Sequence, residues 1–87
     1  MPKTKRTLTA TISASEEGIL WEGQVDSVSS ENSQGPFDIL WGHANFVTIV
    51  HNKPVILRKE KLVVKEIVPK TAVVCVKAQE VKIYVNI

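Results

Sequence analysis

The chain has 87 residues, of which 44% are hydrophobic and 23% charged, and its formal net charge is +2. A chain of this length makes one domain and buries roughly 60–65% of the surface that its unfolded form exposes, so the core must be small. No run approaches the roughly 18–20 apolar residues of a membrane-spanning helix, and we therefore expect no transmembrane segment.

The basic residues near the N-terminus are not followed by an apolar segment, which excludes an ordinary secretory signal. We expect one domain over residues 1–87, in which residues 1–6 form a flexible basic N-terminus. The single cysteine, Cys75, cannot form an internal disulfide, and this favours a reducing compartment such as the cytoplasm. Because Cys75 stands between two valines, we expect a buried thiol that packs as a small hydrophobic group.

Charge is unevenly distributed along the chain. Residues 7–52 contain acidic side chains but no lysine or arginine, whereas basic residues dominate from Lys53 onward. Such asymmetry can mark a nucleic-acid or membrane surface. The favoured interpretation is that strands from the two halves pair and that their opposite charges interleave. The basic residues alternate with apolar ones and do not form a nucleic-acid-binding arm.

The first half predicts strands that are separated by polar segments. Apolar and polar residues alternate with a period of two over residues 7–13, with Leu8 on the apolar face. After a polar break at 16–18, a second strand is expected over residues 19–29. Residues 30–36 are polar and predict a turn.

Residues 35–46 combine two glycines, a proline, an aspartate and a histidine with apolar and aromatic side chains. Glycine adopts backbone angles that other residues avoid, and proline fixes its own φ and donates no amide hydrogen bond. This composition predicts a shaped loop between strands. Binding residues are often held on loops of this kind.

The second half predicts short strands over residues 46–50, 55–58, 62–68, 73–77 and 81–87, with β-branched residues throughout. We expect the last of these strands to be an exposed edge that could pair between copies. No window shows a sustained helical period, so helices should be absent or very short. Many short strands with turns between them predict an all-β sandwich or barrel.

Two segments resemble a known family. Residues 18–28, Gly-Ile-Leu-Trp-Glu-Gly-Gln-Val-Asp-Ser-Val, resemble the G-x-L-aromatic-x-G-x-V-x-x-V opening of the epsilon subunit of F-type ATP synthases. Residues 35–44, Gly-Pro-Phe-Asp-Ile-Leu-Trp-Gly-His-Ala, resemble that subunit's G-x-F-G/D-I-L-P-G-H-A signature at the matching distance downstream. Trp41 stands where the family usually has proline. The resemblance extends from about Thr7 to about Arg58.

The resemblance implies a small flattened β-sandwich of about eight to ten short strands at the foot of the central stalk. In that family the domain packs against the gamma subunit and the c-ring. It couples proton-driven rotation to ATP synthesis without catalysis of its own. The implied location is the cytoplasmic face of a bacterial inner membrane, through the complex, and no cofactor, metal, nucleic acid or small-molecule substrate is implied.

The resemblance also implies two groups of partner-binding residues. The c-ring contact of the family corresponds to Glu31, Asn32, Ser33, Gln34, Gly35, Pro36 and Phe37. The best candidates for the gamma contact are Trp41, Gly42, His43 and Ala44.

Members of the family usually continue into two C-terminal helices that sometimes bind ATP. The last residues of this chain predict a strand, so we expect no nucleotide site and either a short natural form or an end at a domain boundary.

Catalytic and metal-binding interpretations are weaker. The chain has two histidines, His43 and His51, and Asp38, Ser29 and Ser30 are near in sequence, but no nucleophile motif surrounds either serine. We expect His43 to hydrogen-bond to the backbone of its loop. Two histidines and one cysteine do not make a recognisable zinc set.

The two tryptophans have different expected roles. Trp21 lies in a predicted strand, and core packing is expected for it. Trp41 lies beside Gly42 in the shaped loop, where partner contact and loop packing remain equally open.

Two other functional classes remain. The chain could be a free-standing β-sandwich adaptor that serves another protein through its acidic first half and Trp41. RNA binding on the C-terminal strands is the weaker alternative, because Tyr84 is the only aromatic residue there.

Overall fold

The computed structural model describes residues 6–86, and these residues form nine β-strands and no helix. The strands, in chain order, are β1 (Leu8–Ala14), β2 (Gly18–Val25), β3 (Ser27–Asn32), β4 (Gly35–Leu40), β5 (Phe46–His51), β6 (Val55–Lys59), β7 (Leu62–Ile67), β8 (Thr71–Lys77) and β9 (Glu80–Val85). The all-β prediction is therefore confirmed. Residues 1–5, which belong to the predicted flexible N-terminus, and residue 87 lie outside the described residues.

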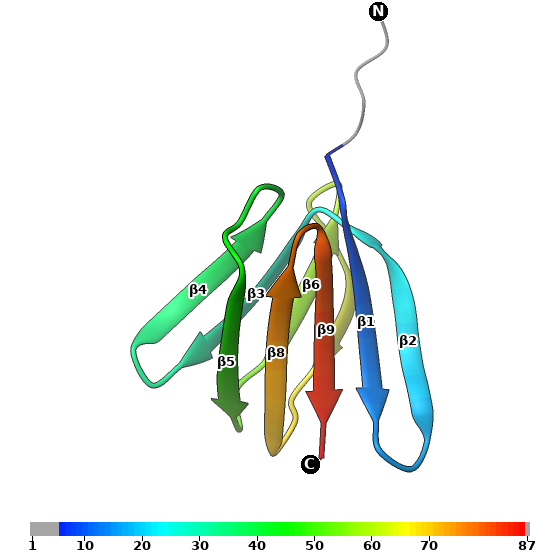
Figure 1. Ribbon diagram of the computed structural model, residues 1–87, viewed down its shortest axis with the longest axis vertical. Helices are drawn as coiled ribbons and strands as arrows, with labels where there is room; N and C mark the ends of the chain where they lie inside the picture. The colour runs from blue at the N-terminus through cyan, green and yellow to red at the C-terminus, as the bar shows by residue number, and fades with distance from the viewer. Residues whose placement is uncertain (1–5, 87) are drawn as a thin grey trace, which may run out of the picture.

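The strands form two sheets that pack face to face (Figure 1). One sheet has the order β2-β1-β9-β8-β5 and the other the order β4-β3-β6-β7. Neighbouring strands are antiparallel except β1 and β9, which pair in parallel from Thr9–Glu80 to Ala14–Val85. The expectation that residues 81–87 form an exposed edge is therefore wrong for β9. It lies between β1 and β8, because the first strand of the chain pairs with its other edge.

Inward-facing side chains of both sheets form one apolar core. Successive side chains of a strand point to opposite faces, and burial in β1 alternates accordingly, with Leu8 and Ile12 buried and the threonines between them only half-buried. In β9 the apolar residues that alternate with polar ones, Val81 and Ile83, are both fully buried. Burying an aliphatic side chain of this size stabilises the fold by roughly 1.5–3 kcal/mol.

The strand predicted over residues 19–29 is two strands in different sheets. Val25 and Val28 are both buried although they are three residues apart, so the period of two is interrupted between them. The interruption is at Asp26, where the chain crosses from one sheet to the other. The Asp26 amide donates to the Arg58 carbonyl, and its carboxylate accepts a hydrogen bond from the amide of Glu60.

The structure places Trp21 as predicted and Cys75 differently. Trp21 is half-buried and packs against the core from β2. Its ring lies over Gly23, where an added Cβ would come within 2.9 Å of the indole. Cys75 is half-exposed, because it faces outward on β8 while its neighbours Val74 and Val76 face the core.

The connections gather at the two ends of the sandwich (Figure 1). The β3–β4 hairpin turn lies at the lower end in this view, and the loop from β4 to β5 lies at the upper end, near the β8–β9 turn. The candidate sites are therefore at opposite ends of the two-layer body.

Candidate protein-interaction sites

The segment predicted as a polar turn over residues 30–36 is mainly a β-hairpin. Strand pairing continues to Asn32 and Gly35, and only Ser33 and Gln34 form the turn. The prediction failed because polar side chains also suit a strand whose outer face is solvated. The hairpin brings the residues from Glu31 to Pro36 to one end of the sandwich, whereas Phe37 lies further along β4, where its ring contacts Phe46.

Two hydrogen bonds of Asn32 fix the tip of this hairpin. Its Oδ1 accepts from the Gln34 amide at 2.9 Å, an arrangement that closes an Asx turn. Its Nδ2 donates to Thr48 Oγ1 on β5 at 3.0 Å, which ties the tip to the other sheet. Ser33 and Gln34 remain exposed at the tip.

Glu31 is already paired within the chain. Its carboxylate lies 3.8 Å from the Lys53 ammonium, and both side chains are nearly half exposed. Exposed pairs of this kind contribute about 0–1 kcal/mol and exchange partners readily. Glu31 and Lys53 also border a shallow depression of about 140 Å³ between the hairpin tip and His51 at the end of β5.

Pro36 and Phe37 differ in their availability to a partner. Pro36 is exposed on β4, an edge strand, where the missing amide hydrogen leaves no ladder bond unmade. Phe37 points the other way, packs against the core and lies edge-on to Phe46 at 5.6 Å between ring centroids. The expectation that Phe37 contacts a partner conflicts with this inward orientation.

The second group of candidate residues lies in a loop that is shorter than predicted. Residues 35–40 are strand β4, and only residues 41–45 connect it to β5. The His43 amide donates to the Leu40 carbonyl at 3.0 Å, and Gly42 between them has φ +83°. This is the geometry of a type II turn, which requires positive φ at its third residue and often has proline at its second.

The histidine of this loop is held by its own backbone and by an aromatic ring. His43 Nδ1 lies 2.8 Å from the Ala44 carbonyl oxygen, as expected for a residue that hydrogen-bonds to its loop. Its ring also lies edge-on to Phe46 at 5.4 Å between centroids. Ser29 and Asp38 bond to each other on the outer face of the four-stranded sheet, with Arg58 donating to the serine hydroxyl. The histidine and this serine–aspartate pair therefore belong to different surfaces.

Trp41 is the large exposed side chain of the loop, with 45% of its surface accessible. The guanidinium of Arg6 lies over its ring at 4.7 Å from the centroid, within the range of a cation–π contact. Of the two readings left open by the sequence, this exposure favours partner contact.

A third surface was not predicted. On the outer face of the five-stranded sheet, cross-strand register aligns Ile49, Val73 and Tyr84, and Val47 lies in the next row beside Cys75. Val47 and Ile49 are 66% and 51% exposed. A signal was present in residues 46–50, where the apolar run has a single polar residue and both faces of the strand are therefore largely apolar.

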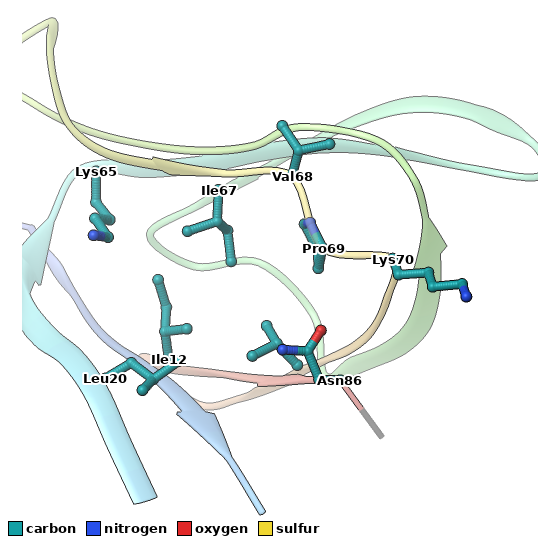
Figure 2. Close-up of a pocket in the computed structure, with 9 residues that line it drawn as sticks. Ile12, Leu20, Lys65, Ile67, Val68, Pro69, Lys70 and Asn86 are labelled. Carbon is teal, nitrogen blue, oxygen red and sulfur yellow. The ribbon is translucent and has the colours of Figure 1, made fainter. Parts of the chain in front are cut away.

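A cavity of about 260 Å³ opens between β2 and β7 (Figure 2). Its lining is aliphatic except for Lys65, Lys70 and Asn86. Lys65 reaches from β7 towards Ile12 and Leu20 on the opposite sheet, whereas Lys70 points away from the cavity. Among the described residues no three histidine, cysteine, aspartate or glutamate side chains are grouped so that they could hold a metal ion.

The fold agrees with that of a known protein family. The family model for the beta-sandwich domain of the ATP synthase delta/epsilon chain matches residues 8–87. The chain belongs to this family. The match includes the C-terminal strands, where the sequence motifs carry no signal. The comparison with curated proteins found no match.

Solved structures of ATP synthases share the fold. A chain of the central stalk and c-ring of the Tetrahymena thermophila mitochondrial ATP synthase superposes with a TM-score of 0.74 at 13% identity, covering 97% of this chain and 66% of its own. A chain of the Euglena gracilis mitochondrial ATP synthase, solved as OSCP, F1 and c-ring, gives 0.77 at 18% identity, covering 97% of this chain and 53% of its own. The delta/epsilon domain described here thus spans about half to two-thirds of the length of these relatives.

Within residues 6–86, no helix has the length and apolar character needed to cross a membrane.

Proposed function

We propose that this delta/epsilon domain is a non-catalytic component of the central stalk of an F-type ATP synthase. It binds the gamma subunit and the c-ring and couples rotation of the ring, driven by proton flow, to ATP synthesis in the catalytic head. It is peripheral to the membrane that contains the ring. The observation that carries the proposal is the family match over residues 8–87.

The arrangement of the candidate sites supports this role. The β3–β4 hairpin tip and the Trp41–Ala44 loop lie at opposite ends of one sandwich (Figure 1). Strand β4 connects the tip to the loop and belongs to one of two sheets that pack on a common core. A closely packed body of this kind deforms little, so a force applied at one end reaches the other.

The polar hairpin tip is the proposed ring contact. Ser33 and Gln34 are exposed, and Glu31 can exchange Lys53 for a basic or amide group of the ring without leaving a buried charge. The contact therefore depends on polar complementarity, which fixes the register of two surfaces more than it adds affinity.

The loop of residues 41–44 is the proposed gamma contact, and the apolar outer face that follows it on β5 extends the same surface. Exposed tryptophan is enriched among the residues that dominate interface energies. Val47 and Ile49 continue the apolar surface from the loop along the edge of the sheet.

Co-purification of the chain with the gamma subunit of the same genome tests the proposal. We expect Trp41→Ala and His43→Ala to weaken gamma binding at least about tenfold, with Val68→Ala, an exposed apolar residue away from the loop, as the matched control. Trp41→Pro suits the second position of the type II turn, so it should keep the melting temperature, but it removes the exposed indole of this chain and should weaken binding as Trp41→Ala does. A folded chain that does not bind gamma would overturn the proposal and favour the free-standing adaptor.

A further inference from the structure

Two reciprocal hydrogen bonds join the Trp41–Ala44 loop region to the β8–β9 turn. The Gly42 amide donates to Gln79 Oε1 at 3.2 Å, and the Ala78 amide donates to Asn45 Oδ1 at 3.1 Å. Each segment thus supplies one backbone donor and one side-chain acceptor. The residues joined by these bonds are 37 and 33 positions apart in the sequence, so no local motif predicts the contact.

The β8–β9 turn is a firm support for these bonds. Its two strands are interior strands of the five-stranded sheet, with β9 paired to both β1 and β8. The Gln79 carbonyl also accepts a hydrogen bond from the Thr9 amide on β1 at 2.9 Å. The Gln79 side chain is therefore presented from a residue whose backbone is held by a neighbouring strand.

The loop, in contrast, connects strands at the edges of two different sheets. β4 is an edge of the four-stranded sheet and β5 an edge of the five-stranded sheet. The type II turn fixes the local shape through the bond between His43 and Leu40. It does not fix the direction in which that turn projects from the sandwich. The two bonds to Gln79 and Ala78 supply this constraint.

We propose that Gln79 and Asn45 are positioning residues that hold the loop in the orientation in which Trp41 and His43 meet the partner. The inference rests on the proposed gamma contact and specifies how the loop is prepared for it. A loop that is ordered before binding loses less conformational entropy in the complex, and its affinity rises accordingly. The partner then contacts the Trp41 indole, over which the Arg6 guanidinium lies.

Variants that remove or keep the acceptor atom test the inference. Gln79→Met and Asn45→Ala remove the side-chain oxygens, whereas Gln79→Glu and Asn45→Asp keep them. Gln24→Met is the matched control, because in the described contacts the Gln24 side chain bonds to Thr7 and Thr9 and not to the loop.

The first measurement is amide hydrogen exchange in the isolated chain. We expect exchange of the Gly42 amide to quicken about tenfold in Gln79→Met and that of the Ala78 amide to quicken similarly in Asn45→Ala. The conservative variants and the control should match the wild type. Unchanged exchange in both removal variants would overturn the inference, whatever the chain binds.

The second measurement is the affinity for the gamma subunit. We expect Gln79→Met and Asn45→Ala to bind about five- to tenfold more weakly, mainly through faster dissociation, and the conservative variants to restore binding. Faster exchange with unchanged affinity would refute the positioning role while leaving the proposed function intact. Failure of the wild type to bind gamma would instead refute the proposed function, and the positioning role with it.

Discussion

At the residue scale, the backbone at Lys61 adopts a left-handed conformation that a Cβ disfavours. The two-residue turn between β6 and β7 places Glu60 at φ 54° and Lys61 at φ 68°. Positive φ at both central positions is the type I′ geometry, for which asparagine followed by glycine is preferred.

Lys61→Gly should therefore raise the free energy of unfolding by about 1 kcal/mol, because glycine adopts this conformation without the steric penalty of a Cβ. Urea denaturation measures the change. Lys59→Gly, in the adjoining strand, should lower stability by about 0.5–1 kcal/mol. Equal or lower stability of Lys61→Gly would contradict the turn assignment.

Gly23 is required by its neighbour Trp21. A Cβ at position 23 would lie 2.9 Å from the indole, so the ring must move or the strand must shift. We expect Gly23→Ala to cost about 1–3 kcal/mol, the usual range for overpacking. In a Trp21→Leu background the same substitution should cost much less, and a double-mutant cycle from thermal or urea unfolding measures this coupling. Additive effects would show that the contact carries no energy.

At the element scale, β7 is an edge strand that another strand could pair with. It is an edge of the four-stranded sheet, and Leu62, Val63 and Val64 are all exposed. Lys65 pairs with the buried Leu57 and therefore faces inward, beside the cavity of Figure 2. An inward-pointing charge at an edge discourages the addition of another strand.

Lys65→Leu should remove this protection. We expect its free energy of unfolding to be about 1 kcal/mol higher, because leucine fills part of the cavity. We also expect it to self-associate at high concentration. Sedimentation equilibrium measures the association. Lys77→Leu makes the same change on β8, which is paired on both sides, and should stay monomeric. A monomeric Lys65→Leu would show that the lysine does not guard the edge.

Alternation of side chains predicts the individual strands well but not how they pair. The strand over residues 7–13 and the inward residues of β9 follow from a period of two, because that pattern directly reflects which face is buried. The β1–β9 pairing joins Thr9 to Glu80, and no local feature of either strand specifies it. The change of sheet at Asp26 was missed for a related reason. Polar residues continue on both sides of it, and only the burial of Val25 and Val28 shows that the phase has changed.

The candidate sites were predictable in part. The Leu40–His43 turn has a sequence signal, since Gly42 supplies the positive φ that the turn needs. No sequence signal predicts the inward orientation of Phe37 or the hydrogen bond between Gln79 and the Gly42 amide. Both depend on contacts between segments that are distant in the sequence.

At the scale of the whole molecule, the account depends on two contacts at opposite ends of one stiff sandwich. The hairpin tip at Ser33 is assigned to the ring, and the loop at Ala44 is assigned to gamma. Both residues are exposed, so each tolerates a photo-reactive amino acid without disturbing the core.

Site-specific photo-cross-linking in the assembled synthase tests this arrangement most directly. A probe at Ser33 should give an adduct with the c-ring subunit, a probe at Ala44 an adduct with gamma, and a control probe at the exposed Glu22 on β2 neither. Adducts exchanged between the two ends, or a chain that is absent from the assembled complex, would contradict the account.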